Sequence, residues 1–304
     1  MLVSGDEILR KATEGKYGVA AYNFVNMEIL QVIIQAANEE KSPLIIATSE
    51  GAIKYMGDSY VKAFIDVVRS DAQVPVAFHL DHGQSLDMVK RVIGLGYTSV
   101  MIDASKYDFE KNIAITKEVV EYAHQHGVSV EAELGTIGGV EDNIEAKEII
   151  FTDPAKAKEF AERTGCDSLA VAIGTSHGAY KFKGKAELHF DVLDQIRSAV
   201  SIPLVLHGAS SIPDEAVDRI NQFGGEMEHT HGVDGDVLQE AVRRGIAKVN
   251  TDSDLRLIWT GSVRQVLAEK KSEFDPRNII GPARGLILEY IKSRMRLLGS
   301  SGKG

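Results

Sequence analysis

The chain has 304 residues, of which 44 % are apolar and 26 % charged, and its formal net charge is −10. This composition excludes a disordered chain, and an acidic balance without a basic stripe argues against non-specific binding to nucleic acid. The first residues lack the basic and apolar regions of a signal peptide, and no stretch has the length of a membrane span. The single Cys166 cannot form an internal disulfide, so we expect a packed thiol in a cytoplasmic protein that contacts neither membrane nor nucleic acid.

Short apolar, β-branched runs recur along the chain, and each predicts a strand. Between them lie stretches with helical periodicity, which often end at glycine. The strands are expected at 18–24, 43–49, 75–83, 99–105, 128–135, 168–178, 203–210 and 247–254, and examples of the helices are 27–41, 85–96, 109–127 and 213–225.

Eight strand and helix pairs without a linker predict an α/β chain folded as one (β/α)8 TIM barrel domain over residues 1–304. A C-terminal helical extension is expected near 276–304, with one extra helix and a frayed tail over 281–304. A doubly wound sheet is the alternative. The glycines at 94 and 96 are no dinucleotide fingerprint, since Ser99 stands where the third glycine belongs.

Polar residues end nearly every expected strand, at the rim where barrel enzymes place their active sites. Three histidines at this rim are each followed by glycine, and three imidazoles with a free fourth position are typical of catalytic zinc. The alternative is that these three are ordinary core or cap histidines. Four histidines lie away from the rim, and we interpret them as structural or surface residues: His124, His126, His229 and His231. The strand-end residues are Asn23, Ser49, Asp81, His82, Asp103, Ser105, Glu133, His177, His207, Asn250 and Asp252.

Two carboxylates of the fifth expected strand, Glu131 and Glu133, share the parity that points into the barrel. Because buried carboxylates are costly unless paired or metal-bound, Glu133 near the rim is a candidate metal ligand and Glu131 a deeper structural partner. The glycine-rich and then acidic residues 136–150 predict a mobile lid carrying Glu141. The alternative is a solvated acidic loop.

Five motifs follow one another at these strand ends: HLDHG (79–83), EAELGTIGGVED (131–142), GTSHGAYK (174–181), LHGAS (206–210) and NTDSDLR (250–256). Together they resemble the class II, metal-dependent fructose-1,6-bisphosphate aldolases, in the branch that includes tagatose-bisphosphate aldolases. The resemblance extends from the first residues to 275–284. It implies a zinc-dependent lyase of glycolysis and gluconeogenesis that reversibly cleaves fructose-1,6-bisphosphate to dihydroxyacetone phosphate and glyceraldehyde 3-phosphate. Tagatose-1,6-bisphosphate, which differs only in configuration at C4, is the alternative substrate.

The resemblance also implies roles for the rim residues. Asp81 would exchange a proton with the C4 hydroxyl, and Glu141 would transfer a proton at C3. The metal would stabilise an enediolate as a Lewis acid. The implied ligands of Zn²⁺, or of Co²⁺ or another divalent ion, are His82, His177 and His207, with Glu133 as an alternative ligand.

Further residues match the family's substrate contacts. Asn23 would contact sugar hydroxyls, while Ser49 and Arg256 would hold the far phosphate. Relatives often need a monovalent cation, Na⁺ or K⁺, and form dimers or tetramers in which an arginine of a neighbouring subunit, here Arg277 or Arg284, reaches the site. The residues that match the dihydroxyacetone phosphate site are Gly178, Lys181, Gly208, Ser210, Asn250, Asp252 and Ser253.

Three other functions are alternatives to this one. A Schiff-base aldolase needs an interior lysine, and Lys248 shares the parity of Asn250 but lies near the start of its strand. A zinc hydrolase would carry an H-x-H pair on the first strand, which here ends in YNF. A non-catalytic sugar-phosphate-binding barrel would have lost the proton-transfer residues, yet Asp81 and Glu141 are present. Residues 227–232 match none of the motifs.

Overall fold

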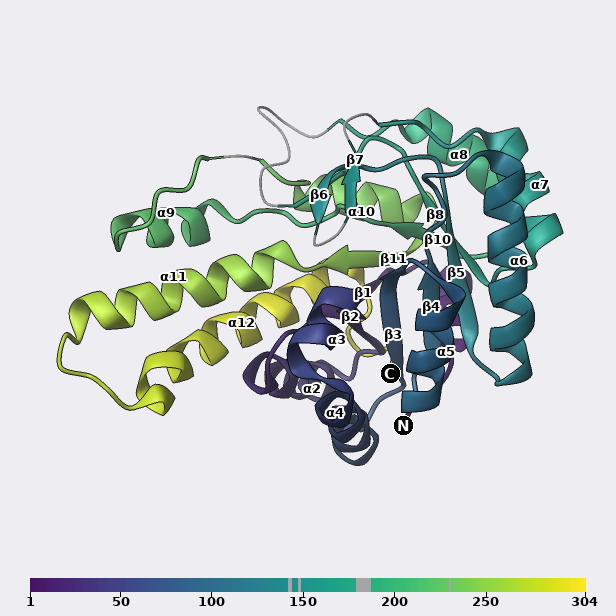
Figure 1. Cartoon of the computed structure of the whole chain (residues 1–304). Coiled ribbons are helices and arrows are strands. Elements are labelled where there is room, and N and C mark those ends of the chain that lie inside the picture. Colours follow the sequence, from purple (N-terminus) through teal and green to yellow (C-terminus); the bar gives the residue numbers. More distant parts are fainter. Residues whose placement is uncertain (142–143, 147–148, 179–186, 230) are drawn as a thin grey trace.

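The computed structural model describes residues 1–141, 144–146, 149–178, 187–229 and 231–304. Within these residues, eight parallel strands close into a barrel in the order β1-β11-β10-β8-β5-β4-β3-β2, which confirms the predicted fold (Figure 1). The barrel strands are β1 Val19–Asn23, β2 Leu44–Ser49, β3 Val76–Gly83, β4 Ser99–Ile102, β5 Ser129–Leu134, β8 Ser168–Val171, β10 Leu204–Leu206 and β11 Ile246–Thr251.

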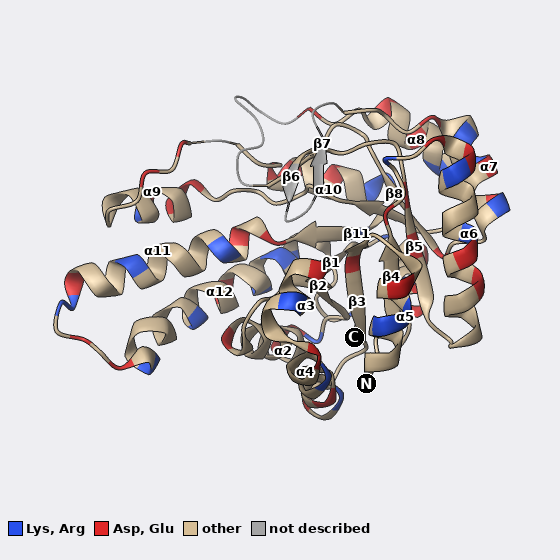
Figure 2. Ribbon diagram, in the orientation of Figure 1, with Lys and Arg blue, Asp and Glu red and all other residues tan. Residues whose placement is uncertain are grey.

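Helices surround the barrel, and many begin with a side-chain cap, such as Ser85 or Asp108, which accepts from a backbone N–H of the first turn. None of the described helices combines the length and the apolar character needed to cross a membrane. The helices are α1 Gly5–Gly15, α2 Met27–Glu40, α3 Glu50–Met56, α4 Asp58–Asp71, α5 Leu86–Leu95, α6 Phe109–Gln125, α7 Pro154–Thr164, α8 Phe190–Ala199, α9 Asp214–Gln222, α10 Gly235–Arg243, α11 Ser253–Glu269 and α12 Pro276–Leu298. Acidic and basic residues are interspersed along the outer helices (Figure 2).

The barrel interior is layered from the amino to the carboxyl ends of its strands. Helix α1 closes the first end, where Ile8 and Leu9 join an apolar cluster with Val19, Ile45 and other strand residues. The next layers contain both apolar and charged side chains: a small apolar cluster of Met101, Ala170 and Val205, and the buried Glu131 and Lys248. Polar groups therefore increase toward the carboxyl rim, where the sequence predicts the site.

A small second sheet crosses the rim and consists of β6 Gly138–Glu141, β7 Ile144–Ala146 and β9 Ser176–His177. The expected single strand over 168–178 is therefore wrong in its length: β8 ends at Val171, and His177 lies in β9. Gly174 separates the two strands with a φ of +116°, a backbone conformation that a regular strand cannot contain. Strands β6 and β7 fall within the predicted lid, whose mobility stays a prediction.

Helices α11 and α12 pack side by side and extend from the barrel as an arm (Figure 1). The extra helix begins at Pro276, earlier than residue 281. The predicted frayed tail is wrong, because Gly302 N–H donates to Glu40 O at 2.8 Å and Gly304 N–H donates to Lys41 O at 2.7 Å. These bonds satisfy carbonyls at the end of α2 that the helix itself leaves free.

Candidate metal centre and active site

Three histidines from different segments meet at the carboxyl rim. His82 lies at the end of β3, His177 in β9 and His207 directly after β10. The ring centroid of His82 is 4.9 Å from that of His177 and 4.6 Å from that of His207, and all three side chains are buried. One ring nitrogen of each lies within 4.8 Å of those of the others. The structure thus brings together the three histidines predicted as metal ligands.

The local backbone explains how Asp81 and His82 both face the site although they are neighbours in a strand. Regular alternation would point one of the two side chains away from the barrel. His82 instead has a φ of +49°, and the pairing of β3 with β4 shifts register between Leu80 and Gly83. This bulge turns the chain, so that both side chains are buried at the rim.

Carboxylates orient two of the three histidines. His82 Nδ1 lies 3.0 Å from Asp103 Oδ2, and His207 Nε2 lies 2.7 Å from Glu131 Oε1. A neutral imidazole that donates from one nitrogen to a carboxylate offers the other nitrogen as a ligand. The nitrogen of His82 that remains for a metal is Nε2, whereas His207 Nδ1 lies 3.1 Å from Asn250 Nδ2, a contact that a bound metal would replace.

Buried atoms of this cluster fit a cation. Among the described residues, His82 Nε2 and Glu133 Oε2 are buried without a hydrogen-bond partner. His82, Asp103 and Glu133 also form a second group whose ligand atoms lie within 4.8 Å of one another. Since an unpaired buried acceptor is costly, a divalent metal would satisfy atoms that the protein leaves without a partner.

The electrostatics of the cluster also favour positive charge. Burial alone would lower the pKa of His82, but the hydrogen bond with Asp103 and the charge of Asp81 raise it to about 10. Burial raises the pKa of Glu133 well above its ordinary range, and the nearby charge of Asp103 raises it further. Glu133 therefore needs a proton or a cation beside it, as a metal-site carboxylate would.

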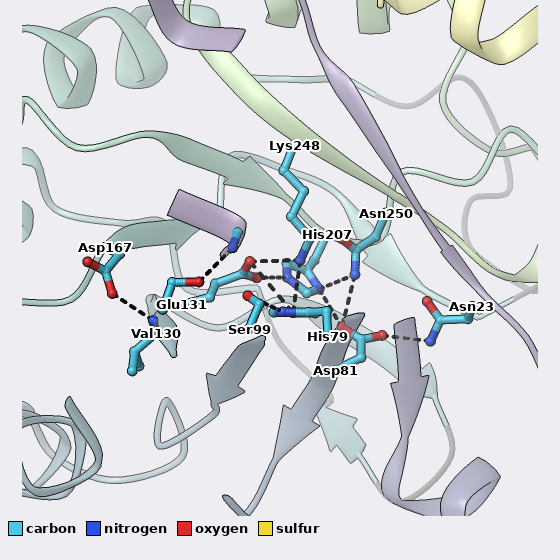
Figure 3. Close-up of polar contacts among 12 residues, drawn as sticks. Asn23, His79, Asp81, Ser99, Val130, Glu131, Asp167, His207, Lys248 and Asn250 are labelled. Carbon is cyan, nitrogen blue, oxygen red and sulfur yellow. Dashed lines mark hydrogen bonds and ion pairs between the residues drawn. The ribbon is translucent and has the colours of Figure 1, made fainter. Parts of the chain in front are cut away.

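Asp81 is held as a carboxylate by two amides (Figure 3). Asn23 Nδ2 donates to its Oδ2 at 2.8 Å, and Asn250 Nδ2 donates to its Oδ1 at 3.0 Å. Burial would raise the pKa of Asp81, but the charges of His82 and His207 outweigh burial and hold it well below the ordinary range. Asp81 is thus ionised at neutral pH and can accept a proton.

A buried ion pair lies beside His207 and His79 (Figure 3). Lys248 Nζ donates to Glu131 Oε2 at 2.7 Å and lies 3.3 Å from His79 Nε2. Burial would raise the pKa of Glu131, but the Lys248 charge and the hydrogen bond of His207 hold it well below the ordinary range. Glu131 is the deeper, paired carboxylate that its position in the strand predicts, and the Lys248 amine is engaged in this pair.

A small pocket beside the histidines gathers most of the predicted phosphate contacts. Gly208 has a φ of +62°, and a Cβ there would lie 2.6 Å from Ser176 O, so the loop after β10 approaches β9 this closely only because this residue is glycine. Helix α11 begins at Ser253, so its N-terminus faces the same pocket. The residues that line the pocket are Asn23, Gly178, Gly208, Ala209, Ser210, Asn250, Asp252 and Ser253.

Other predicted site residues have different surroundings. Ser49 Oγ accepts from Ala52 N–H and caps α3, and Arg256 pairs with Asp252 at 2.7 Å. Arg277 pairs with Asp275, while Arg284 lines a cavity between α2 and α4. Lys181 and the side chain of Glu141 lie outside the described residues.

Asp103 is predicted from the sequence only as a strand end, without a role of its own. Its function as the partner of His82 depends on the pairing of β3 with β4. The signal that could have found it is its place at the end of the neighbouring strand, one position beyond β4.

Comparisons with known proteins agree with this site. Residues 3–303 match the family described as fructose-bisphosphate aldolase class-II. The fructose-bisphosphate aldolases of Thermus caldophilus and of Helicobacter pylori (strain ATCC 700392 / 26695) are 50 % and 49 % identical to this chain, with 100 % of each chain covered. The crystal structure of the YdjI aldolase from Escherichia coli K12 has a TM-score of 0.81 and 34 % identity, and the match covers 100 % of this chain and 99 % of that chain. Because the family match includes the histidine cluster, Asp81 and every barrel strand, this chain belongs to the class II fructose-bisphosphate aldolase family.

Proposed function

We propose that this chain is an aldolase that reversibly cleaves fructose-1,6-bisphosphate to dihydroxyacetone phosphate and glyceraldehyde 3-phosphate, a reaction of glycolysis and gluconeogenesis. The proposal rests on the three buried histidines that meet at the barrel rim, together with the buried Asp81, whose carboxylate accepts hydrogen bonds from Asn23 and Asn250. The 50 % identity over full length to the aldolase of Thermus caldophilus supports the same substrate.

His82, His177 and His207 would hold the metal, with Glu133 as a further ligand. A divalent metal bound there would act as a Lewis acid that polarises the substrate carbonyl. Three imidazoles with an open fourth position favour Zn²⁺, and Co²⁺ accepts the same ligands. A monovalent cation, Na⁺ or K⁺, is proposed near the phosphate loops.

Asp81 is the proposed general base. In the cleavage direction its carboxylate accepts the proton of the C4 hydroxyl while the C3–C4 bond breaks, and it returns that proton to the aldehyde oxygen in condensation. The amides of Asn23 and Asn250 fix both carboxylate oxygens for this transfer. We assign the protonation of C3 to Glu141, carried by a lid over 136–150.

The phosphate of the dihydroxyacetone half would bind in the pocket that is lined by residues after β9, β10 and β11. Backbone N–H groups and the N-terminus of α11 suit an anion, and they act against the overall negative charge of the chain. Asn23 would contact sugar hydroxyls, and Ser49 with Arg256 would hold the far phosphate. The proposed phosphate contacts are Gly178, Lys181, Gly208, Ser210, Asn250, Asp252 and Ser253.

We also propose a single cytoplasmic domain over residues 1–304 that assembles into a homo-oligomer, a dimer or a tetramer. In that assembly Arg277 or Arg284 would reach the site of a neighbouring subunit. Both residues lie on α12, which belongs to the arm that extends from the barrel (Figure 1).

Substrate choice is tested by measuring the formation of dihydroxyacetone phosphate from fructose-1,6-bisphosphate and tagatose-1,6-bisphosphate side by side. We expect faster cleavage of the fructose compound, and the Asp81→Asn variant is the matched control because it keeps the shape of the side chain. A higher rate with tagatose-1,6-bisphosphate would instead identify that substrate. If the zinc-loaded protein cleaves neither sugar, the aldolase proposal fails, and hydrolysis or sugar-phosphate binding without catalysis takes its place.

A further inference from the structure

The loop over residues 208–212, which carries Gly208 and Ser210, is hydrogen-bonded to a buried carboxylate. Asp254, the second residue of α11, is fully buried. Its Oδ2 accepts from Ser211 N–H at 3.0 Å, and its Oδ1 accepts from Ile212 N–H at 2.8 Å. One carboxylate therefore fixes two consecutive amides of the loop, next to the pocket-lining residues Gly208 and Ser210.

This loop has a conformation that needs support. Ile212 has a φ of +51°, which a β-branched residue rarely adopts. Such a backbone persists only where its surroundings stabilise it. The two hydrogen bonds to Asp254 provide that support at the strained residue and at the residue before it.

The arm helix α12 completes the arrangement. Tyr290 Oη donates to Asp254 Oδ2 at 2.5 Å, and Arg294, one turn later, donates from Nη1 to Ser211 Oγ at 3.0 Å. Burial raises the pKa of Tyr290 well above its ordinary range, and the charge of Asp254 raises it further, so the phenol keeps its proton and remains a donor. Two side chains on one face of α12 thus contact the structure that holds the loop.

A third segment lies against the same loop. Val233 N–H donates to Ser210 O at 3.1 Å, and Ser211 Oγ donates to Val233 O at 2.7 Å. A Cβ at Gly232 would lie 2.2 Å from Ser210 O, so only glycine permits this approach. The end of the stretch 227–232, which no motif explains, therefore supports the loop that carries Ser210.

We propose that Asp254 and Tyr290 are positioning residues for phosphate recognition. They act through the backbone of Ser211 and Ile212 to keep Gly208 and Ser210 in the geometry that binds the phosphate of the dihydroxyacetone half. The inference rests on the proposed function, because that function assigns the phosphate to this pocket. It also gives α12 a part in substrate binding within its own chain.

The test compares Tyr290→Phe with Tyr22→Phe. Tyr22 is a matched control, since its buried hydroxyl also contacts α12, donating to Ile291 O at 3.2 Å, but within the described residues forms no hydrogen bond with the loop. For Tyr290→Phe we expect about a tenfold weaker affinity for dihydroxyacetone phosphate and a similar rise in KM, because a hydrogen bond to a charged group is lost. We expect kcat and the dissociation constant of Zn²⁺ to stay near those of the parent protein, because Tyr290 contacts none of the three histidines.

Amide hydrogen exchange measures the stability of the loop directly and therefore tests the inference without an activity assay. Exchange at Ser211 and Ile212 should accelerate in Tyr290→Phe and stay unchanged in Tyr22→Phe. Asp254→Asn should accelerate it further, and if that variant does not fold, Tyr290→Phe alone decides. Unchanged exchange and unchanged affinity in Tyr290→Phe, or equal losses in both tyrosine variants, would overturn the inference. A parent protein that cleaves no sugar bisphosphate would refute the proposed function, whereas the exchange data would still show whether the loop depends on Tyr290.

Discussion

Replacing Lys248 with methionine tests the buried ion pair inside the barrel. Lys248 and Glu131 are exposed by only 0 % and 2 %, and their charged atoms are 2.7 Å apart. Methionine fills a similar volume but leaves the Glu131 carboxylate without its cation. Removal of one partner of a buried pair typically costs about 3 to 5 kcal/mol. Because His207 still donates to Glu131, we expect a loss of about 3 kcal/mol in the free energy of unfolding at pH 7.

The assay is urea unfolding of the metal-free protein, followed by circular dichroism. The double variant Lys248→Met with Glu131→Gln should regain part of the loss, because it no longer buries an unpaired charge. The single variant should also lose less stability at acid pH, where Glu131 without its cation can take up a proton. A loss below about 1 kcal/mol, or an equal loss in the single and double variants, would refute this account of the pair.

Three further predictions concern the site. Asp81→Asn should lower kcat by about 10²- to 10⁴-fold with little change in zinc affinity, and an active Asn variant would exclude Asp81 as the base. Asp103→Asn should weaken zinc binding by about 10- to 100-fold in competition with a chromophoric chelator, whereas unchanged binding would show that Asp103 does not orient His82. Burial and the Lys248 charge lower the pKa of His79 from 6.5 to about 3, so the unfolded chain binds more protons between these pH values. The free energy of unfolding of the metal-free protein should therefore fall as the pH drops below 6.5, by up to about 1.4 kcal/mol per pH unit, and His79→Gln should reduce this slope; parallel curves would contradict the assignment.

The barrel could be predicted because its signals are local. Each strand shows an apolar run and each helix a periodic face, and the rim follows from the rule that strands of such a barrel end together. The three histidines could be predicted as a cluster for the same reason. His177 is predicted at the end of a barrel strand, but it lies in β9, which belongs to the small sheet.

What the sequence could not predict depends on contacts between distant segments. The bulge after Leu80 arises from the pairing of β3 with β4, and alternation within one strand gives no sign of it. The partner of Lys248 depends on how far β11 and β5 are offset across the barrel, with 117 residues between Lys248 and Glu131. The C-terminal tail resembles a disordered end in composition, but free carbonyls at the end of α2 bind it.

In the proposed mechanism, the three-histidine cluster binds the metal on which aldol cleavage depends. The most direct measurement is a titration of the EDTA-treated protein with Zn²⁺, in which bound zinc and cleavage of fructose-1,6-bisphosphate are followed together. We predict no cleavage after EDTA, and a rate that rises in proportion to bound zinc until each chain holds one ion at this cluster. Cleavage that persists without metal, together with a covalent substrate adduct after borohydride reduction, would contradict this mechanism and would indicate a lysine Schiff base instead.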